Sequence, residues 1–217
     1  MGIDIGPIEV TDGLLFQIDA ANTRSYTGTG LTANGLSGIG GTLVNGVSFT
    51  SANAGAFVFD GSNDYINFGN TSIVQQSSGS LSVWTKSSSP GGSFRGIFAK
   101  QYAYGLFYAD SILVAYDWGA PATRSTGINI ADNTWKYVVY TFQSGVTNGS
   151  NIYLNGSLVL TTTMTISDQS LGNLFGGAEA NASQFASCQA SSFSMYNRAL
   201  SATEVLQNYN ATKGRYR

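Results

Sequence analysis

The chain has 217 residues, of which only 10 % are charged, and its net charge is −2. An average soluble domain carries roughly 25 % charged residues, so this chain is unusually poor in charge. It has no basic stripe apart from its last five residues, and this argues against nucleic-acid binding. Histidine is absent and Cys188 is the single cysteine, so a Ser-His-Asp triad, an intrachain disulfide and a thiolate zinc cluster are excluded. We expect no signal peptide and no membrane insertion, because the apolar runs are short.

Short runs rich in Val, Ile, Tyr, Phe and Thr recur along the chain, separated by Gly, Asn, Ser and Asp. We expect strands at residues 14–20, 56–61, 65–69, 80–86, 96–100, 102–109, 111–118, 135–142, 151–160 and 192–197. Asn155-Gly156 divides one run and predicts a type I′ hairpin turn, since both residues tolerate positive φ. Residues 22–50 have few bulky side chains and are expected to be irregular. The pattern is typical of an all-β sandwich or barrel.

The segment FDGSNDYINFG, residues 59–69, concentrates acids and amides between two expected strands. Asp60, Asn63 and Asp64 offer hard oxygen atoms, which calcium prefers, so they form a weak candidate metal site. The alternative is mechanical. Asp and Asn side chains accept hydrogen bonds from nearby backbone amides in tight turns, and here they would shape the turn without a metal.

The segment YAYGLFYADSILVAYDW, residues 102–118, predicts an aromatic hairpin. A turn at Asp110-Ser111 would place Ala109 opposite Ile112. Because side chains alternate along a strand, one face would hold core residues Phe107, Ile112, Val114, Tyr116 and Trp118. The other would hold Leu106 and Leu113 with a candidate glycan site of Tyr102, Tyr104, Tyr108 and Asp117. Aromatic faces beside a carboxylate suit a sugar, although a second packed face or a subunit contact is the alternative.

One helix is predicted near the end of the chain. Ser201 and Glu204 have the spacing of a capping box, in which each side chain bonds to the other's backbone amide. Val205, Leu206 and Tyr209 are expected to pack on the sandwich, and the helix is expected to end at residues 213–214. A basic tail follows to residue 217.

Five segments, in order, carry a family resemblance: GLLFQIDAANTRSY, FVFDGSNDYINFG, SLSVWTK, DNTWKYVVYTFQSG with NIYLNGSLV, and FSMYNRALSATEVLQNYNATKGRY. Together they resemble the concanavalin A-like, laminin-G-like jelly-roll family over residues 13–216. The last segment is similar to the form found in structural proteins of tailed bacteriophages. The resemblance implies two facing antiparallel sheets with a helix closing one edge. We therefore expect one domain: an extended arm (1–12), a jelly-roll sandwich (13–200), and a capping helix with a basic tail (201–217).

The glutamates do not support a hydrolase. Glucanases of this fold carry Glu-x-Asp-x-x-Glu, because retaining hydrolysis needs two carboxyl groups about 5 Å apart. The chain has only Glu9, Glu179 and Glu204, and the pattern is absent. We expect no enzyme activity, no catalytic residue and no cofactor, with calcium left open.

Two functions remain from this sequence. The resemblance favours a virion structural protein of a bacteriophage, made in the host cytoplasm and bound to the virion surface as a capsid decoration or fibre-like protein. Its partners would be the major capsid protein or a tail component, with homo-oligomers possible. The residues expected to dock are Ile3, Ile5, Pro7, Ile8, Lys213, Arg215, Tyr216 and Arg217. The alternative is a lectin-like carbohydrate-binding module that recognises a bacterial cell-surface glycan.

Overall fold

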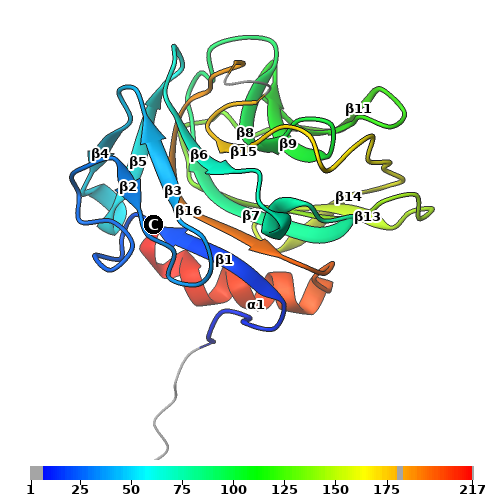
Figure 1. Ribbon diagram of the computed structural model, residues 1–217, viewed down its shortest axis with the longest axis horizontal. Helices are drawn as coiled ribbons and strands as arrows, with labels where there is room; N and C mark the ends of the chain where they lie inside the picture. The colour runs from blue at the N-terminus through cyan, green and yellow to red at the C-terminus, as the bar shows by residue number, and fades with distance from the viewer. Residues whose placement is uncertain (1–6, 180–182, 217) are drawn as a thin grey trace, which may run out of the picture.

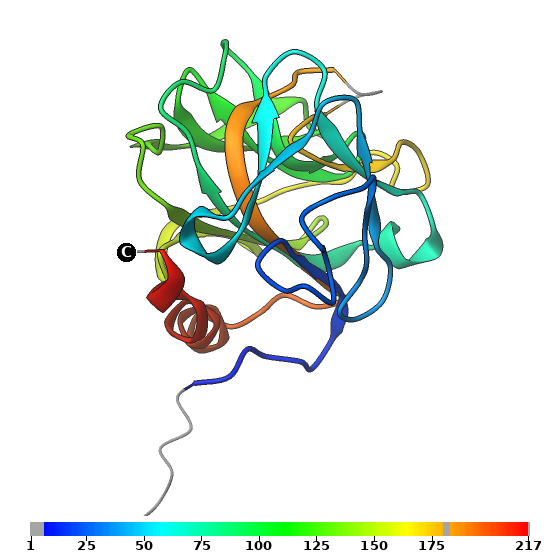
Figure 2. The same ribbon diagram turned by 90° about the vertical axis from the view of Figure 1, so that its left-hand side faces the viewer.

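The structure, a computed structural model, describes residues 7–179 and 183–216. Two antiparallel sheets pack against each other, and helix α1 (Ala202–Thr212) lies along the outer side of the first sheet (Figures 1 and 2). The predicted all-β jelly-roll sandwich with one short C-terminal helix is confirmed. In the described ranges, no helix is both long enough and apolar enough to cross a membrane.

The first sheet runs in the order β14 (Ser157–Thr162), β13 (Ser150–Leu154), β12 (Lys136–Gln143), β7 (Ser78–Lys86), β16 (Ser187–Tyr196), β5 (Ala56–Asp60) and β4 (Ser48–Thr50). Strand β1 (Leu14–Asp19) also pairs with β16. The second sheet runs in the order β11 (Ala122–Asn129), β10 (Ile112–Asp117), β9 (Tyr104–Ala109), β8 (Arg95–Lys100), β15 (Leu174–Gly176), β6 (Tyr65–Gly69), β3 (Gly41–Val44) and β2 (Thr32–Ala33). Short 3-10 turns occupy Ala52–Ala54, Ser72–Val74 and Lys213–Arg215.

Aromatic side chains fill the space between the sheets. Phe98 of the second sheet lies 5.0 Å from Phe193 of the first, ring centre to ring centre, and 5.6 Å from Phe68. All three side chains are buried. Burying an aromatic side chain of this size contributes about 1.5–3 kcal/mol, so this cluster holds the two sheets together.

Most expected strands are present within two residues of their predicted ends, and the Asn155-Gly156 turn is confirmed by φ angles of 51° and 82°. The expectation that residues 22–50 are irregular is wrong in part, because β2, β3 and β4 form there. Strands β11 and β15 were not predicted. β11 is polar and contains Gly127, and β15 has only three residues, so neither carries an apolar pattern of useful length.

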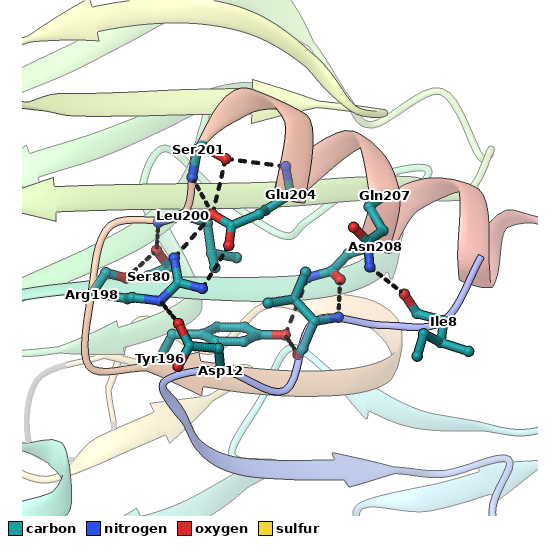
Figure 3. Close-up of polar contacts among 11 residues, drawn as sticks. Ile8, Asp12, Ser80, Tyr196, Arg198, Leu200, Ser201, Glu204, Gln207 and Asn208 are labelled. Carbon is teal, nitrogen blue, oxygen red and sulfur yellow. Dashed lines mark hydrogen bonds and ion pairs between the residues drawn. The ribbon is translucent and has the colours of Figure 1, made fainter.

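The capping box of α1 is confirmed and extends into a charged cluster (Figure 3). The Glu204 carboxylate accepts a hydrogen bond from the Ser201 backbone amide and pairs with Arg198 at 2.6 Å. Arg198 also pairs with Asp12 at 2.9 Å. This cluster joins the start of the helix to the segment that precedes β1.

The helix packs on the outer face of the first sheet as expected, with Val205 buried and Tyr209 partly buried. The prediction for Leu206 is confirmed only in part, since its side chain lies beside Gly156 of the β13–β14 turn but remains 45 % exposed. The buried residue that the pattern missed is Asn208. Its side-chain oxygen accepts a hydrogen bond from the Val10 amide at 2.7 Å, and its amide group donates to the Tyr196 hydroxyl at 3.1 Å.

Candidate functional site

The aromatic hairpin forms with the predicted register. Ala109 lies opposite Ile112 and Phe107 lies opposite Val114, with Asp110 and Ser111 at the turn. Both turn residues have positive φ, at 46° and 73°, as a two-residue hairpin turn requires. The alternation of side chains across β9 and β10 is therefore as expected.

The assignment of the glycan face is wrong, whereas that of the core face is confirmed in part, because Phe107 and Val114 are buried and Ile112, Tyr116 and Trp118 pack against them partly buried. The face expected to meet a glycan is buried in the main core, where Tyr104, Tyr108 and Asp117 are each at most 1 % exposed. The Tyr104 hydroxyl donates to the backbone oxygen of Val74, and the Tyr108 hydroxyl lies 2.9 Å from that of Thr85. Because both phenols find partners, these residues can be buried at little cost.

The remaining members of that set do not form a site either. Asp117 pairs with Arg124 at 2.8 Å and accepts hydrogen bonds from the Ala120 and Thr165 amides. Its carboxylate is thus occupied inside the protein. Tyr102 is 38 % exposed, but the other three expected members are not at the surface with it.

The opposite face of the hairpin carries a pocket instead. The pocket has a volume of about 360 Å³ and lies over β8 to β11. Strands β8, β9 and β11 are labelled at the upper right of Figure 1. It is lined by Phe94, Gln101, Tyr116, Trp118, Thr123, Glu179 and Gln184. These side chains come from β10 and the turn that follows it, from β11, and from the segments that flank β8 and follow β15.

An aromatic wall forms one part of the pocket. Tyr116 and Trp118 are two positions apart and so project to the same side, with ring centres 5.1 Å apart in an edge-to-face arrangement. Phe94 stands 6.0 Å from Tyr116 and stacks on Phe107 behind it at 4.6 Å. Tyr116, Trp118 and Phe94 are each only partly buried, so their rings are accessible to a ligand.

Small residues allow the segment that carries Glu179 and Gln184 to lie close to β8. The Gly96 amide donates to the Gln184 backbone oxygen at 2.9 Å, and the Gly177 amide donates to the Ile97 oxygen at 2.9 Å. A side chain at Gly96 would meet the Ala178 backbone at 2.3 Å. This close backbone contact requires glycine and brings Glu179 and Gln184 toward the aromatic wall.

Glu179 is the most unusual group in the pocket. It is only 5 % exposed, and burial raises the pKa of its carboxyl to about 7. Among the described residues, none donates a hydrogen bond to this carboxylate. Two further acceptors, Oε1 of Gln101 and Oε1 of Gln184, are buried without a hydrogen-bond partner. The site therefore combines exposed aromatic rings with unpaired oxygen acceptors.

Sequence reasoning missed this site. The alternation of apolar residues predicts Tyr116 and Trp118 in the core. Glu179 stands out in the sequence only as one of three glutamates. Its isolation in the small-residue segment GGAEANAS was the single available indication. Nothing in the sequence places that segment beside Trp118, which is more than 60 positions away.

The acidic turn at residues 60–64 has the geometry of the structural alternative. Asp60 Oδ1 accepts a hydrogen bond from the Ser62 amide at 2.7 Å. Asp64 is 2 % exposed and accepts hydrogen bonds from the Gly46 amide at 2.7 Å and the Asp60 amide at 3.2 Å. Asn63 is exposed, and its backbone oxygen accepts a hydrogen bond from the Asn45 side chain at 2.6 Å. The Asp60 carboxylate thus shapes the turn itself, and the Asp64 carboxylate joins the turn to the β3–β4 connection.

A smaller pocket of about 160 Å³ lies near Lys86 and Cys188 on the first sheet. Burial raises the pKa of the Cys188 thiol to about 12, so the reactive thiolate is scarcely populated at neutral pH. The other residues that line this pocket are Val58, Phe59, Lys86, Ser87, Ser88, Asn133, Ser187 and Gln189. Phe59 is the single aromatic residue among them and is buried.

The residues expected to dock on a capsid are divided between the surface and internal contacts. Pro7 is exposed and Ile8 is 68 % exposed, whereas Ile3, Ile5 and Arg217 lie outside the described residues. The backbone oxygen of Ile8 accepts a hydrogen bond from Gln207 at 2.8 Å (Figure 3). Val10 is buried beneath α1, so residues 8–10 lie against the domain.

The tail makes mainly internal contacts, and its docking role stays a prediction. Arg215 forms two hydrogen bonds with the Asp19 carboxylate, at 2.7 and 2.8 Å. Tyr216 stacks on Trp84 with ring centres 3.9 Å apart. Lys213 donates to the Asn210 side chain. Arg215 and Tyr216 are therefore engaged in fixing the tail to the first sheet.

Comparison with solved structures gives similar folds at low sequence identity. The binding domain of Paraclostridial Mosquitocidal Protein 1 is 16 % identical over 92 % of this chain and 52 % of that chain, with a TM-score of 0.68. Trypanosoma rangeli sialidase in complex with sialic acid is 12 % identical over 94 % of this chain and 34 % of that chain, with a TM-score of 0.70. The botulinum neurotoxin type G receptor binding domain is 19 % identical over 91 % and 51 %, with a TM-score of 0.62.

This chain thus spans about half the length of the toxin binding domains and a third of the sialidase chain. At these identities the likeness shows the fold. No curated protein sequence matches the chain. A family model described as the concanavalin A-like lectin/glucanases superfamily matches residues 60–206. Because this match covers more than half of the chain, the protein belongs to the concanavalin A-like lectin/glucanases superfamily.

Proposed function

We propose that the protein is a lectin-like carbohydrate-binding domain and that the pocket over β8 to β11 is its sugar site. The observation that carries the proposal is the pairing of partly exposed Tyr116 and Trp118 with unpaired polar groups in one pocket. Aromatic faces pack against the C–H groups of a sugar ring, while amide and carboxyl oxygens accept hydrogen bonds from its hydroxyls.

Several features favour binding over hydrolysis. Among the described residues that line the pocket, Glu179 is the single carboxylate. Canonical glycoside hydrolysis uses two carboxyl groups that flank the scissile bond. Two of the similar structures are named as toxin binding domains, although a sialidase is also among them. We therefore propose a non-enzymatic role.

A glycan array with purified protein tests this function, and variants then locate the site. Trp118→Ala should weaken binding of any glycan found by about tenfold or more, because a central aromatic residue typically contributes over 1 kcal/mol. Tyr102→Ala is the matched control, since Tyr102 is exposed but does not line the pocket. Glycan binding that survives Trp118→Ala unchanged would refute this location. Repeating the assay with a chelator tests whether calcium takes part.

The virion location stays a prediction. Among the described residues that are expected to dock, Ile8 has an exposed apolar side chain that a partner could contact. Co-sedimentation with virus-like particles tests it. Deletion of residues 1–6 is the suitable variant, because it keeps the Val10–Asn208 hydrogen bond that holds the segment to α1.

A further inference from the structure

The described residues that line the pocket at Glu179 carry acceptors and no cationic side chain. They include Glu179 together with Gln101 and Gln184, whose buried Oε1 atoms have no hydrogen-bond partner and reach a ligand only after the side chains turn toward the pocket. Among the described lining residues there is no lysine or arginine. Arg95, beside Phe94 on β8, donates to the backbone oxygens of Gly91 and Phe94 and does not line the pocket.

This imbalance favours a ligand that donates hydrogen bonds. A buried acceptor without a partner loses its hydration and gains nothing in return, so a donor placed against it is strongly favoured. A charged donor makes a shorter and stronger hydrogen bond to a carboxylate than a neutral hydroxyl does. An anionic ligand would meet the Glu179 carboxylate with no cation in the pocket to offset the repulsion.

We propose that this pocket selects an amino sugar, whose ring carries a protonated amine, over neutral and anionic sugars. The proposal rests on the sugar site proposed above. In the bound complex the ammonium group donates to Glu179, and neighbouring ring hydroxyls donate to Gln101 and Gln184. The sugar ring packs on Trp118 and Tyr116.

The ionisation of Glu179 supports the same assignment. Burial raises the pKa of Glu179 to about 7, so without a ligand its carboxyl group is largely protonated at pH 5. A bound cation stabilises the ionised form and offsets the cost of burying the charge. The preference for an amine should therefore be present at pH 7 and weaker at pH 5.

The test uses matched sugars and nuclear magnetic resonance. Isotopically labelled protein is titrated with glucosamine and glucose, galactosamine and galactose, and N-acetylneuraminic acid, while the tryptophan indole signals and the backbone amide signals of the residues that line the pocket are followed. Within each pair the two sugars differ only at C2, in amine against hydroxyl. We expect the amino sugar of at least one pair to bind about tenfold more tightly at pH 7, the size expected for a hydrogen bond between charged groups. We expect N-acetylneuraminic acid to bind most weakly.

Two variants separate this inference from the proposed function. Glu179→Gln should remove the preference for the amine while leaving binding of the hydroxyl sugar within about twofold, because the glutamine keeps a side-chain oxygen of similar shape. Trp118→Ala should weaken both members of a pair.

Equal binding of amine and hydroxyl sugars, or tighter binding of N-acetylneuraminic acid, would overturn the inference and leave the sugar site intact. If no sugar moves the tryptophan signals or the amide signals of the pocket, the proposed function fails and this inference fails with it. Wild-type protein that keeps its full preference for the amine at pH 5 would also contradict the role of Glu179.

Discussion

Replacing Glu179 with glutamine removes a buried carboxyl whose ionisation opposes folding. The pKa of this group is raised from 4.5 to about 7 by burial, so the folded state binds its proton more tightly than the unfolded state does. Stability is then highest below pH 4.5 and falls as the pH rises toward 7. At pH 8 the wild-type protein carries the whole penalty, whereas glutamine, which does not ionise, carries none.

The size of the effect follows from the two pKa values. Each pH unit between them is worth about 1.4 kcal/mol, so the interval between 4.5 and about 7 corresponds to about 3 kcal/mol. In a protein of this size 1 kcal/mol shifts the melting temperature by about 2–4 °C. We therefore expect Glu179→Gln to raise the melting temperature by about 6–12 °C at pH 8 and to change it little at pH 4.

Thermal denaturation followed by circular dichroism at pH 4 and pH 8 measures this difference. Glu204→Gln is the matched control, because hydrogen bonding and pairing with Arg198 lower the pKa of Glu204 to about 2. That contribution is present above pH 4.5 and is lost as the pH falls toward 2, so the control variant should be less stable than wild type at pH 8. If Glu179→Gln is equally stabilising at both pH values, or destabilising at pH 8, the buried ionisation does not oppose folding.

Three further predictions concern stability away from the pocket. Gly156→Ala should lower the free energy of unfolding by about 1 kcal/mol or more, because φ at Gly156 is +82° and the new side chain would lie 3.0 Å from Leu206. Gly214 has open space around it, so Gly214→Ala should change the free energy of unfolding little in the same urea titration. Arg215→Ala should lower the free energy of unfolding by about 1 kcal/mol, because the partly buried Asp19 carboxylate loses its two hydrogen bonds from Arg215. Arg215→Lys should restore only part of that stability. Asp64→Ala should lower the free energy of unfolding by about 1–3 kcal/mol, because it removes the acceptor for the Gly46 and Asp60 amides. A chelator should leave the melting temperature of the wild-type protein unchanged. A large fall in melting temperature with chelator would restore the calcium alternative.

Short-range chemistry in the sequence was sufficient for several elements. The Asn155-Gly156 turn needs only two residues that accept positive φ, and the cap of α1 needs only Ser201 and Glu204 at the right spacing. The hairpin register follows from the turn at Asp110. In each case the interacting groups are a few positions apart, so the local pattern contains the whole interaction.

Some elements carry too little local information to be predicted. Strand β11 alternates small and polar residues, and it is a strand because it pairs with β10 along the edge of the second sheet. Its backbone hydrogen bonds come from a neighbour whose position depends on the rest of the sheet. The same holds for β15, whose three residues are fixed between β6 and β8.

The sequence by itself determined the all-β class, the hairpin with its register and the capping box. It also indicated that the acidic side chains at residues 60–64 can accept hydrogen bonds from the backbone of their own turn. Only the tertiary structure decided which face of the hairpin packs against the opposite sheet. Both faces are aromatic and apolar, so a period of two defines them without ranking them, and the opposite sheet covers the face with Tyr104 and Tyr108. It also brought Glu179 to Trp118, because backbone contacts at Gly96 fold a distant segment over β8. A pocket built from segments far apart in sequence depends on packing, which no local pattern encodes.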